Sequence, residues 1–210
     1  MHVPDSMRLS RCKAYELIDR HGFATLIDAT LQATHLPLLL EQDEGGLGTL
    51  YGHFARANPH WQGLDGTRVL AVFSGPHAYI SPSWYASRPA VPTWNYVAVH
   101  AAGTLELLDR NATRSLLDRT LARHEPELLD DPDMLDTAYF DGMLTGVVGF
   151  RIRLDTLQGK AKLGLHRPQA DRDGVKAALG ASQAPEARQL WHYLQALESE
   201  TLKPQAEDVP

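Results

Sequence analysis

Between two apolar, strand-like runs that end near Phe73 and resume near Tyr96, the chain gathers residue types that could bind and orient a ligand. Four large aromatic residues lie in this segment: Tyr79, Trp84, Tyr85 and Trp94. Hydroxyl and amide side chains stand among them: Ser81, Ser83, Thr93 and Asn95. Rigid rings beside polar groups suit a flat ligand with hydrogen-bonding edges. A Pro-broken connection of this length is uncommon unless it binds something. The segment is therefore either a binding loop or a long hairpin excursion that packs on its own domain.

A second group of candidate residues is cationic. The run 53–59 carries Arg56, whose planar guanidinium matches phosphate, and Asn58, a turn residue that can donate to a ligand. Lys160 and Lys162 add positive charge at the end of a later strand. Each of these residues alone is typical of a solvated surface. Together, cations beside aromatic rings and hydroxyls suit a phosphate ester that carries an aromatic ring system.

Other chemistries find less support. Ten histidines are present, but no pair has the helical i, i+4 spacing or the short paired spacing of a metal site. A haem needs only one axial histidine, so a haem site stays open. Cys12 is the single cysteine, which excludes an intrachain disulfide. No Gly-x-Ser-x-Gly nucleophile motif occurs.

Charge and hydropathy limit the expected partners. The 210 residues carry 20 basic and 26 acidic side chains, so the chain gains nothing overall from the electrostatics that dominate nucleic-acid affinity. The one possible helix–turn–helix lies near the C-terminus, and its second helix carries Arg188 but also Glu186, so direct DNA binding is not expected. No run approaches the roughly 18 apolar residues of a membrane span, and the N-terminus lacks the apolar core of a signal peptide. With one cysteine, this pattern predicts a cytoplasmic protein without a membrane partner.

The spacing of apolar residues predicts the elements that must position these candidates. Strands are predicted over residues 23–27, 32–40, 49–54, 68–73, 96–108 and 146–155. Helices are predicted over residues 12–20, 112–124, 171–179 and 185–197, with Ser10 and Asn111 as caps for the first two. Short strands with peripheral helices predict a mostly β fold of the α+β class, an antiparallel barrel or sandwich. We expect one domain over residues 1–200, C-terminal helices within 170–198, and a disordered tail over 199–210.

Five sequence blocks occur together in the order and spacing of one family. They are A-T-H-L-P-L-L-L (33–40), L-Y-G-H-F-A-R-A-N-P-H-W (50–61), G-P-H-A-Y-I-S-P-S-W-Y (75–85), V-P-T-W-N-Y-V-A-V-H (91–100) and G-F-R-I-R-L-D-T-L-Q-G-K-A-K-L (149–163). In these blocks the chain resembles the PaiB family, described as FMN-binding negative transcriptional regulators. The resemblance implies a split β-barrel like that of the pyridoxamine-phosphate-oxidase-type flavoproteins. It also implies a homodimer with FMN at the subunit interface.

On this resemblance, nine residues are candidates for cofactor binding: Arg56, Asn58, Ser81, Ser83, Thr93, Trp94, Asn95, Lys160 and Lys162. The two lysines would serve as phosphate or interface cations. One departure concerns the cofactor. After the second lysine the family commonly continues Ser-Gln-Asn, whereas here Lys162-Leu163 is followed by Gly164-Leu165 and then by His166-Arg167-Pro168. Polar side chains that could meet FMN or the partner subunit are thus replaced by Gly and Leu, which predicts weakened or lost FMN binding.

Several functions stay open at this point. The first is an FMN-binding negative regulator that acts on transcription indirectly. The second is an FMN-dependent oxidoreductase on a small molecule, in which the flavin carries the hydride chemistry. No residue stands out as its acid or base, so whether the protein is an enzyme is left open. The third is a haem-binding or haem-degrading protein on the same barrel. The fourth is a cofactor-free dimer that keeps the fold.

Overall fold

The computed structural model describes residues 1–130 and 136–201. Within them, seven strands form one sheet in the order β2-β1-β5-β6-β7-β4-β3. The strands are β1 (Phe23–Ile27), β2 (Ala33–Pro37), β3 (Leu39–Glu41), β4 (Thr49–Ala55), β5 (Arg68–Ile80), β6 (Thr93–Leu107) and β7 (Val147–Lys162). The helices are α1 (Arg11–Arg20), α2 (Arg110–His124), α3 (Thr137–Met143), α4 (Gln169–Ala181) and α5 (Pro185–Thr201). Short 3-10 turns are η1 (Asp5–Met7), η2 (Pro59–Trp61), η3 (Pro82–Trp84), η4 (Pro126–Asp130) and η5 (Leu144–Gly146).

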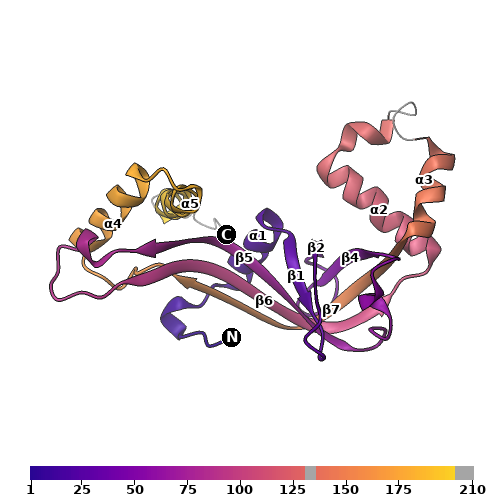
Figure 1. Ribbon diagram of the computed structural model, residues 1–210, viewed down its shortest axis with the longest axis horizontal. Coiled ribbons are helices and arrows are strands. Elements are labelled where there is room, and N and C mark those ends of the chain that lie inside the picture. The colour runs from indigo at the N-terminus through magenta and orange to yellow at the C-terminus, as the bar shows by residue number, and fades with distance from the viewer. Residues whose placement is uncertain (131–135, 202–210) are drawn as a thin grey trace, which may run out of the picture. The chain divides into compact units, whose positions relative to one another are not determined.

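The chain divides into two compact units. The first unit comprises Met1–Val3, Leu9–Ser74 and Ala98–Gly159. The second unit comprises Pro4–Arg8, Gly75–Val97 and the described residues from Lys160 onward. The three central strands, β5, β6 and β7, each run from one unit into the other, and they can be followed along their length in Figure 1.

An aromatic core holds the first unit. Phe54 on β4 and Phe150 on β7 are 1% and 0% exposed, and their ring centroids lie 4.8 Å apart. These two strands are antiparallel neighbours, so their inward side chains stack across the ladder. Large rings that are removed from water in this way are a main source of folding free energy.

Local sequence signals explain where helix α1 begins and how one close contact between strands of the first unit forms. Helix α1 begins at Ser10, whose hydroxyl accepts a hydrogen bond from the backbone N–H of Lys13 at 3.3 Å. Strand β6 approaches β7 at Gly103, where a Cβ atom would lie 2.0 Å from the backbone oxygen of Arg153. Only glycine fits that approach, which is why the long strand carries one there.

In the second unit, β5 and β6 bury one face and expose the other. On β5, Ala78 and Ile80 are buried while Tyr79 between them is exposed. On β6, Asn95 is buried while the preceding Trp94 is exposed. Because successive side chains of a strand point to opposite faces, these patterns define a buried face and an exposed face of the hairpin.

Helices α4 and α5 pack against each other in the second unit (Figure 1). Helix α4 also meets η3, since a Cβ atom at Gly174 would lie 2.1 Å from the backbone oxygen of Trp84. Asp171 adds a polar anchor, because its fully buried carboxylate accepts the backbone N–H of Ser87 at 2.8 Å. Arg167 donates to the other carboxylate oxygen at 3.2 Å. These contacts fix the loop after η3 to the C-terminal helices.

Most predicted elements are present, with changes at their boundaries. The strand predicted to end at residue 73 continues to Ile80, and β6 begins at Thr93, so the Pro/aromatic segment is mostly the end of a hairpin. Gly75 and Pro76 are both buried, and the buried positions change there from odd-numbered to even-numbered residues, but the strand continues past them. The strand predicted over 32–40 divides into β2 and β3, and β7 extends to Lys162. Helix α2 is capped by Asp109, whose carboxylate accepts from Ala112 N at 2.8 Å, and not by Asn111.

Three predictions concern the chain as a whole: its tail, its number of domains and the lack of a membrane span. Of the tail expected to be disordered over residues 199–210, residues 199–201 belong to helix α5, and residues 202–210 lie outside the described residues. The expectation of one domain over residues 1–200 stays a prediction. Among the described residues, no helix is both long enough and apolar enough to cross a membrane.

Candidate functional site

Exposed aromatic rings gather on the open face of the β5–β6 hairpin. Trp94 is 54% exposed and Tyr79 is 46% exposed, and their ring centroids lie 6.2 Å apart in an edge contact. His77 lies beside them, with its ring centroid 6.3 Å from that of Trp94. Alternation along β5 and β6 produces the cluster, because His77 and Tyr79 are two residues apart on one strand and Trp94 lies on its neighbour.

Lysines from β7 meet the same face. Lys160 Nζ lies 5.5 Å from the ring centroid of Tyr96, which is two residues from Trp94 on β6 and therefore shares its face. At the end of β7, Lys162 Nζ donates to Thr93 Oγ1 at 2.6 Å. We call this surface the aromatic–lysine face; it consists of His77, Tyr79, Trp94, Tyr96 and Lys160, with the Thr93–Lys162 pair at its edge. Its rings can stack on a flat ligand, and its lysines can meet an anion.

The two serines of the candidate set form a local turn. Ser81 Oγ accepts the backbone N–H of Ser83 at 3.2 Å, and the two hydroxyl oxygens lie 2.8 Å apart. Ser81 thereby caps η3. Their hydroxyls are engaged with each other and with the backbone, so their visible role is to shape the hairpin end.

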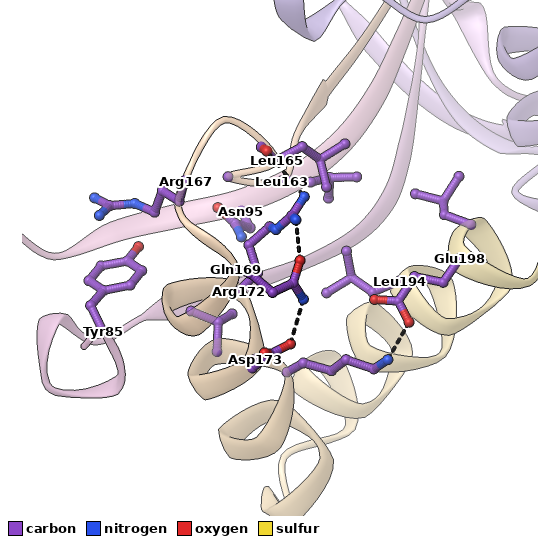
Figure 2. Close-up of a pocket in the computed structure, with 14 residues that line it drawn as sticks. Tyr85, Asn95, Leu163, Leu165, Arg167, Gln169, Arg172, Asp173, Leu194 and Glu198 are labelled. Atoms are coloured by element: carbon purple, nitrogen blue, oxygen red, sulfur yellow. Dashed lines mark hydrogen bonds and ion pairs between the residues drawn. The ribbon is translucent and has the colours of Figure 1, made fainter. Parts of the chain in front are cut away.

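Asn95 faces away from Trp94. It is 3% exposed and lines a cavity of about 560 Å³ (Figure 2). Gly164 and Leu165, the residues that depart from the family pattern, line the same cavity. Leu163, also part of the wall, is buried. The structure thus distributes the candidates of the second unit over two faces of one hairpin.

Arg56 and Asn58 belong to the first unit, where both have structural partners. Arg56 Nε donates to the backbone oxygen of Thr145 at 2.7 Å, and Arg56 Nη2 donates to that of Val147 at 2.8 Å. Asn58 caps η2 by accepting the backbone N–H of His60 at 3.0 Å. These bonds hold the loop that follows β4.

A buried polar network in the first unit was not predicted. The His60 side chain is fully buried; its Nδ1 lies 2.7 Å from Thr34 Oγ1, and its Nε2 lies 3.6 Å from Asp28 Oδ2. Asn58 Nδ2 donates to the same Thr34 oxygen at 3.1 Å. His60 Nε2 has no hydrogen-bond partner in the described chain. The run Asn58-Pro59 signalled the turn, but nothing local in the sequence signals that His60 points inward toward β2.

The Asp28 carboxylate is set up to stay ionised. Burial opposes its ionisation, but hydrogen bonds from the Thr30 side chain and backbone and from the Gln32 backbone outweigh burial and lower the pKa of Asp28. The negative charge therefore faces His60 at neutral pH. In the described residues, including this network, no group of three or more His, Cys, Asp or Glu side chains is placed to hold a metal ion.

Sequence comparisons identify relatives over most of the chain. A family model described as "Putative FMN-binding domain" matches residues 1–156. "Protease synthase and sporulation protein PAI 2" of Bacillus subtilis is 33% identical over 198 residues, covering 90% of this chain and 94% of that protein. An uncharacterized protein of Emericella nidulans is 30% identical over 184 residues, covering 69% of this chain and 73% of that protein. These matches confirm the PaiB resemblance.

Solved structures share the fold. The flavocytochrome Anf3 of Azotobacter vinelandii matches with a TM-score of 0.61 at 15% identity, over 82% of this chain and 78% of that chain. The FAD and haem binding protein of Mycobacterium smegmatis matches with a TM-score of 0.57 at 16% identity, over 85% of this chain and 94% of that chain. At such identities the likeness concerns the fold alone, and it confirms the expected split-barrel architecture with peripheral helices. By its sequence and its fold, the chain belongs to the FMN-binding-domain family, as a PaiB-like member.

Proposed function

We propose that this protein binds FMN on the aromatic–lysine face and acts as a PaiB-type negative regulator of transcription without reading DNA directly. The observation that carries the proposal is the exposed Tyr79–Trp94 pair on a face where Lys160 also lies over the Tyr96 ring, in a chain that belongs to this family. The formal charge of −6 supports indirect regulation, because an acidic chain lacks the electrostatic attraction on which DNA binding depends.

The donor set of the aromatic–lysine face fits FMN. Aromatic rings are suited to stack against the flavin ring system, and half-exposed rings leave that surface accessible. Lys160 and Lys162 are suited to the phosphate, and the Thr93 hydroxyl holds Lys162 in place at 2.6 Å. When bound, FMN would supply hydride or electron transfer, while these residues bind and orient it.

The departure at Gly164 and Leu165 is compatible with this proposal. These residues line the cavity at Asn95, which lies on the face of β6 opposite Trp94. The absence of polar side chains at these two positions changes the lining of the cavity, but Lys160 and Lys162 of β7 are still present to bind a phosphate. We therefore propose that FMN binding is retained on the aromatic–lysine face, with Ser81 and Ser83 of the same unit as further candidate contacts. The proposal does not include Arg56 and Asn58, which hold the loop after β4, or Asn95, which lines the cavity.

We also propose that the protein is a cytoplasmic homodimer with FMN at the subunit interface, in which a second copy covers the bound flavin and the rest of the aromatic–lysine face. Trp94 and Tyr79 expose about half of their side chains next to each other, and clustered exposed aromatics of this kind are typical of interfaces. Replacing Trp94 by Glu places a charge in the patch and should shift the protein to monomers. Light scattering after gel filtration measures the mass; a dimer that is unchanged by Trp94→Glu would contradict this part of the proposal.

A spectroscopic titration tests the function class. Purified protein titrated with FMN should show a saturable shift of the flavin absorption bands and quenched flavin fluorescence. A parallel titration with haemin should give no saturable Soret shift; a Soret shift with haemin alone would replace FMN by haem. Rapid NADPH oxidation by the FMN-bound protein would favour an oxidoreductase, and tight binding of promoter DNA would refute indirect regulation.

A further inference from the structure

A cavity of about 560 Å³ lies within the second unit, a volume typical of small-molecule sites. Its walls come from β6, from the loop after β7, and from helices α4 and α5 (Figure 2). Leu163, Val175, Leu194 and Leu197 supply apolar surface. The ring of Tyr85 adds an aromatic wall, covered by the Arg167 guanidinium 3.8 Å from the ring centroid.

Asn95 brings an amide without a protein partner into this cavity. The residue is 3% exposed, and its side-chain oxygen and nitrogen have no hydrogen-bond partner within the part of the chain that the structure describes. The amide borders Gly164, where a Cβ atom would lie 3.8 Å from Asn95 Nδ2. Neither amide atom is among the buried polar atoms that lack a partner, so the amide stays accessible from the cavity. It can therefore form hydrogen bonds with a ligand there without breaking a bond within the protein.

Arg172 brings a positive charge that no carboxylate balances. Its guanidinium donates to Gln169 Oε1 and to the backbone oxygen of Leu165, the latter at 3.4 Å. Both acceptors are neutral, and Arg172 makes no ion pair among the described residues. A guanidinium in this state can donate hydrogen bonds to the carboxylate of a ligand without first breaking an ion pair.

The other charged residues of the cavity are already engaged. Lys176 pairs with Glu198 across α4 and α5. Arg167 pairs with the buried Asp171, 3.2 Å away. The Asp173 carboxylate accepts from Gln169 Nε2 at 2.7 Å. Arg172 is therefore the group best placed to hold an anion.

From these observations we propose that the cavity binds a small planar organic anion, an aromatic ring that carries a carboxylate. The ring would lie against the leucines and Tyr85, the carboxylate would meet Arg172, and a polar group of the ligand would bond Asn95. The site is distinct from the proposed flavin surface, because Asn95 and Trp94 point to opposite faces of β6. Most of its lining also lies beyond residue 156, where the match to the family model ends.

Isothermal titration calorimetry with 2-naphthoate and its uncharged match 2-naphthamide tests the charge requirement. We expect one saturable 2-naphthoate site per chain, and at least tenfold weaker binding of 2-naphthamide. Arg172→Gln should weaken 2-naphthoate binding at least tenfold. Arg188→Gln, on the exposed side of α5 and outside the cavity lining, should leave the affinity unchanged. No saturable 2-naphthoate binding, or equal affinities for the wild type and Arg172→Gln, would overturn the proposal.

Asn95→Leu separates a ligand role of the amide from a structural role. If the amide serves a ligand, Asn95→Leu should weaken 2-naphthoate binding at least tenfold without lowering the melting temperature of the ligand-free protein. A lowered melting temperature with unchanged 2-naphthoate affinity would show a structural amide and overturn the assignment.

FMN added to the calorimetric titration distinguishes the two sites. The affinity for 2-naphthoate should not change when FMN is present. Competition between the two would assign the cavity to the flavin and overturn the proposal of a separate site. A protein that binds 2-naphthoate but not FMN would refute the proposed flavin function while supporting this cavity.

Discussion

At the scale of single residues, the chemistry of the first unit centres on a shared threonine hydroxyl. Thr34 Oγ1 accepts from Asn58 Nδ2 at 3.1 Å and lies 2.7 Å from Nδ1 of the buried His60. A buried hydrogen bond adds only a modest amount to the free energy of unfolding. Removing one of its partners lowers that free energy by more, because the remaining polar group stays buried without a hydrogen bond. Thr34 should therefore matter for stability far more than its place on a short strand suggests.

Thr34→Val tests this network with nearly the same side-chain volume. We expect the free energy of unfolding to fall by about 1–3 kcal/mol, as His60 and Asn58 lose a partner. Thr25→Val is the matched control, because Thr25 Oγ1 also lies near a histidine Nδ1, that of His35 at 3.0 Å, but at an exposed position. Thr25→Val should lower the free energy of unfolding by no more than about 0.5 kcal/mol. Equal losses in urea unfolding would contradict the importance of the buried network.

At the scale of elements, helix α4 carries the constraint that shapes the cavity. Gly174→Ala would place a methyl group 2.1 Å from the backbone oxygen of Trp84, so α4 or η3 must shift. We expect a loss of roughly 2 kcal/mol or more in the free energy of unfolding, as for other overpacked contacts. Gly142→Ala in α3 meets nothing within 4 Å and should be neutral or stabilising by up to about 1 kcal/mol. Thermal unfolding of both variants measures the difference, and similar melting temperatures would contradict the close packing of α4 on η3.

The anchor between α4 and the loop after η3 should be sensitive to acid. The hydrogen bond from the Ser87 backbone, aided by Arg167, lowers the pKa of the buried Asp171, although burial opposes this. The folded pKa lies below the ordinary value, so the ionised carboxylate contributes stability above about pH 4, and this contribution is lost as the pH falls through the folded pKa. Asp171→Asn cannot ionise. Urea unfolding should therefore show the largest difference between wild type and variant at pH 7 and a smaller one near pH 3; a difference that is constant across this range would contradict the account.

Element positions were largely predictable from local patterns, and side-chain partners were not. Strand β1 follows from five apolar and β-branched residues, and α1 follows from its Ser10 cap, because both signals act within a few residues. The continuation of β5 past Gly75 and Pro76 depends on pairing with a neighbouring strand in the sheet, which local sequence patterns do not report. The Thr34–His60 contact joins residues 26 positions apart, which periodicity does not report.

At the scale of the whole molecule, family membership and fold could be predicted from the sequence blocks. The separation of the candidate site residues onto two faces of the hairpin could not. The blocks place Trp94 and Asn95 side by side in sequence, and the pleat of β6 then directs them to opposite faces. One predicted site therefore becomes an exposed aromatic–lysine face and a separate cavity. The central claim is that the exposed face holds the flavin.

The dissociation constant of FMN for Lys162→Ala tests this claim most directly. The lysine lies beside Thr93 at the edge of the face, and its loss should weaken FMN binding at least tenfold, or about 1.4 kcal/mol. Lys13→Ala on α1 is the matched control and should leave the affinity unchanged. Flavin fluorescence quenching measures all three proteins under one buffer and salt condition. Tenfold weaker binding by Lys162→Ala alone is the predicted result, and an affinity equal to that of the wild type would contradict the placement of the flavin on this face.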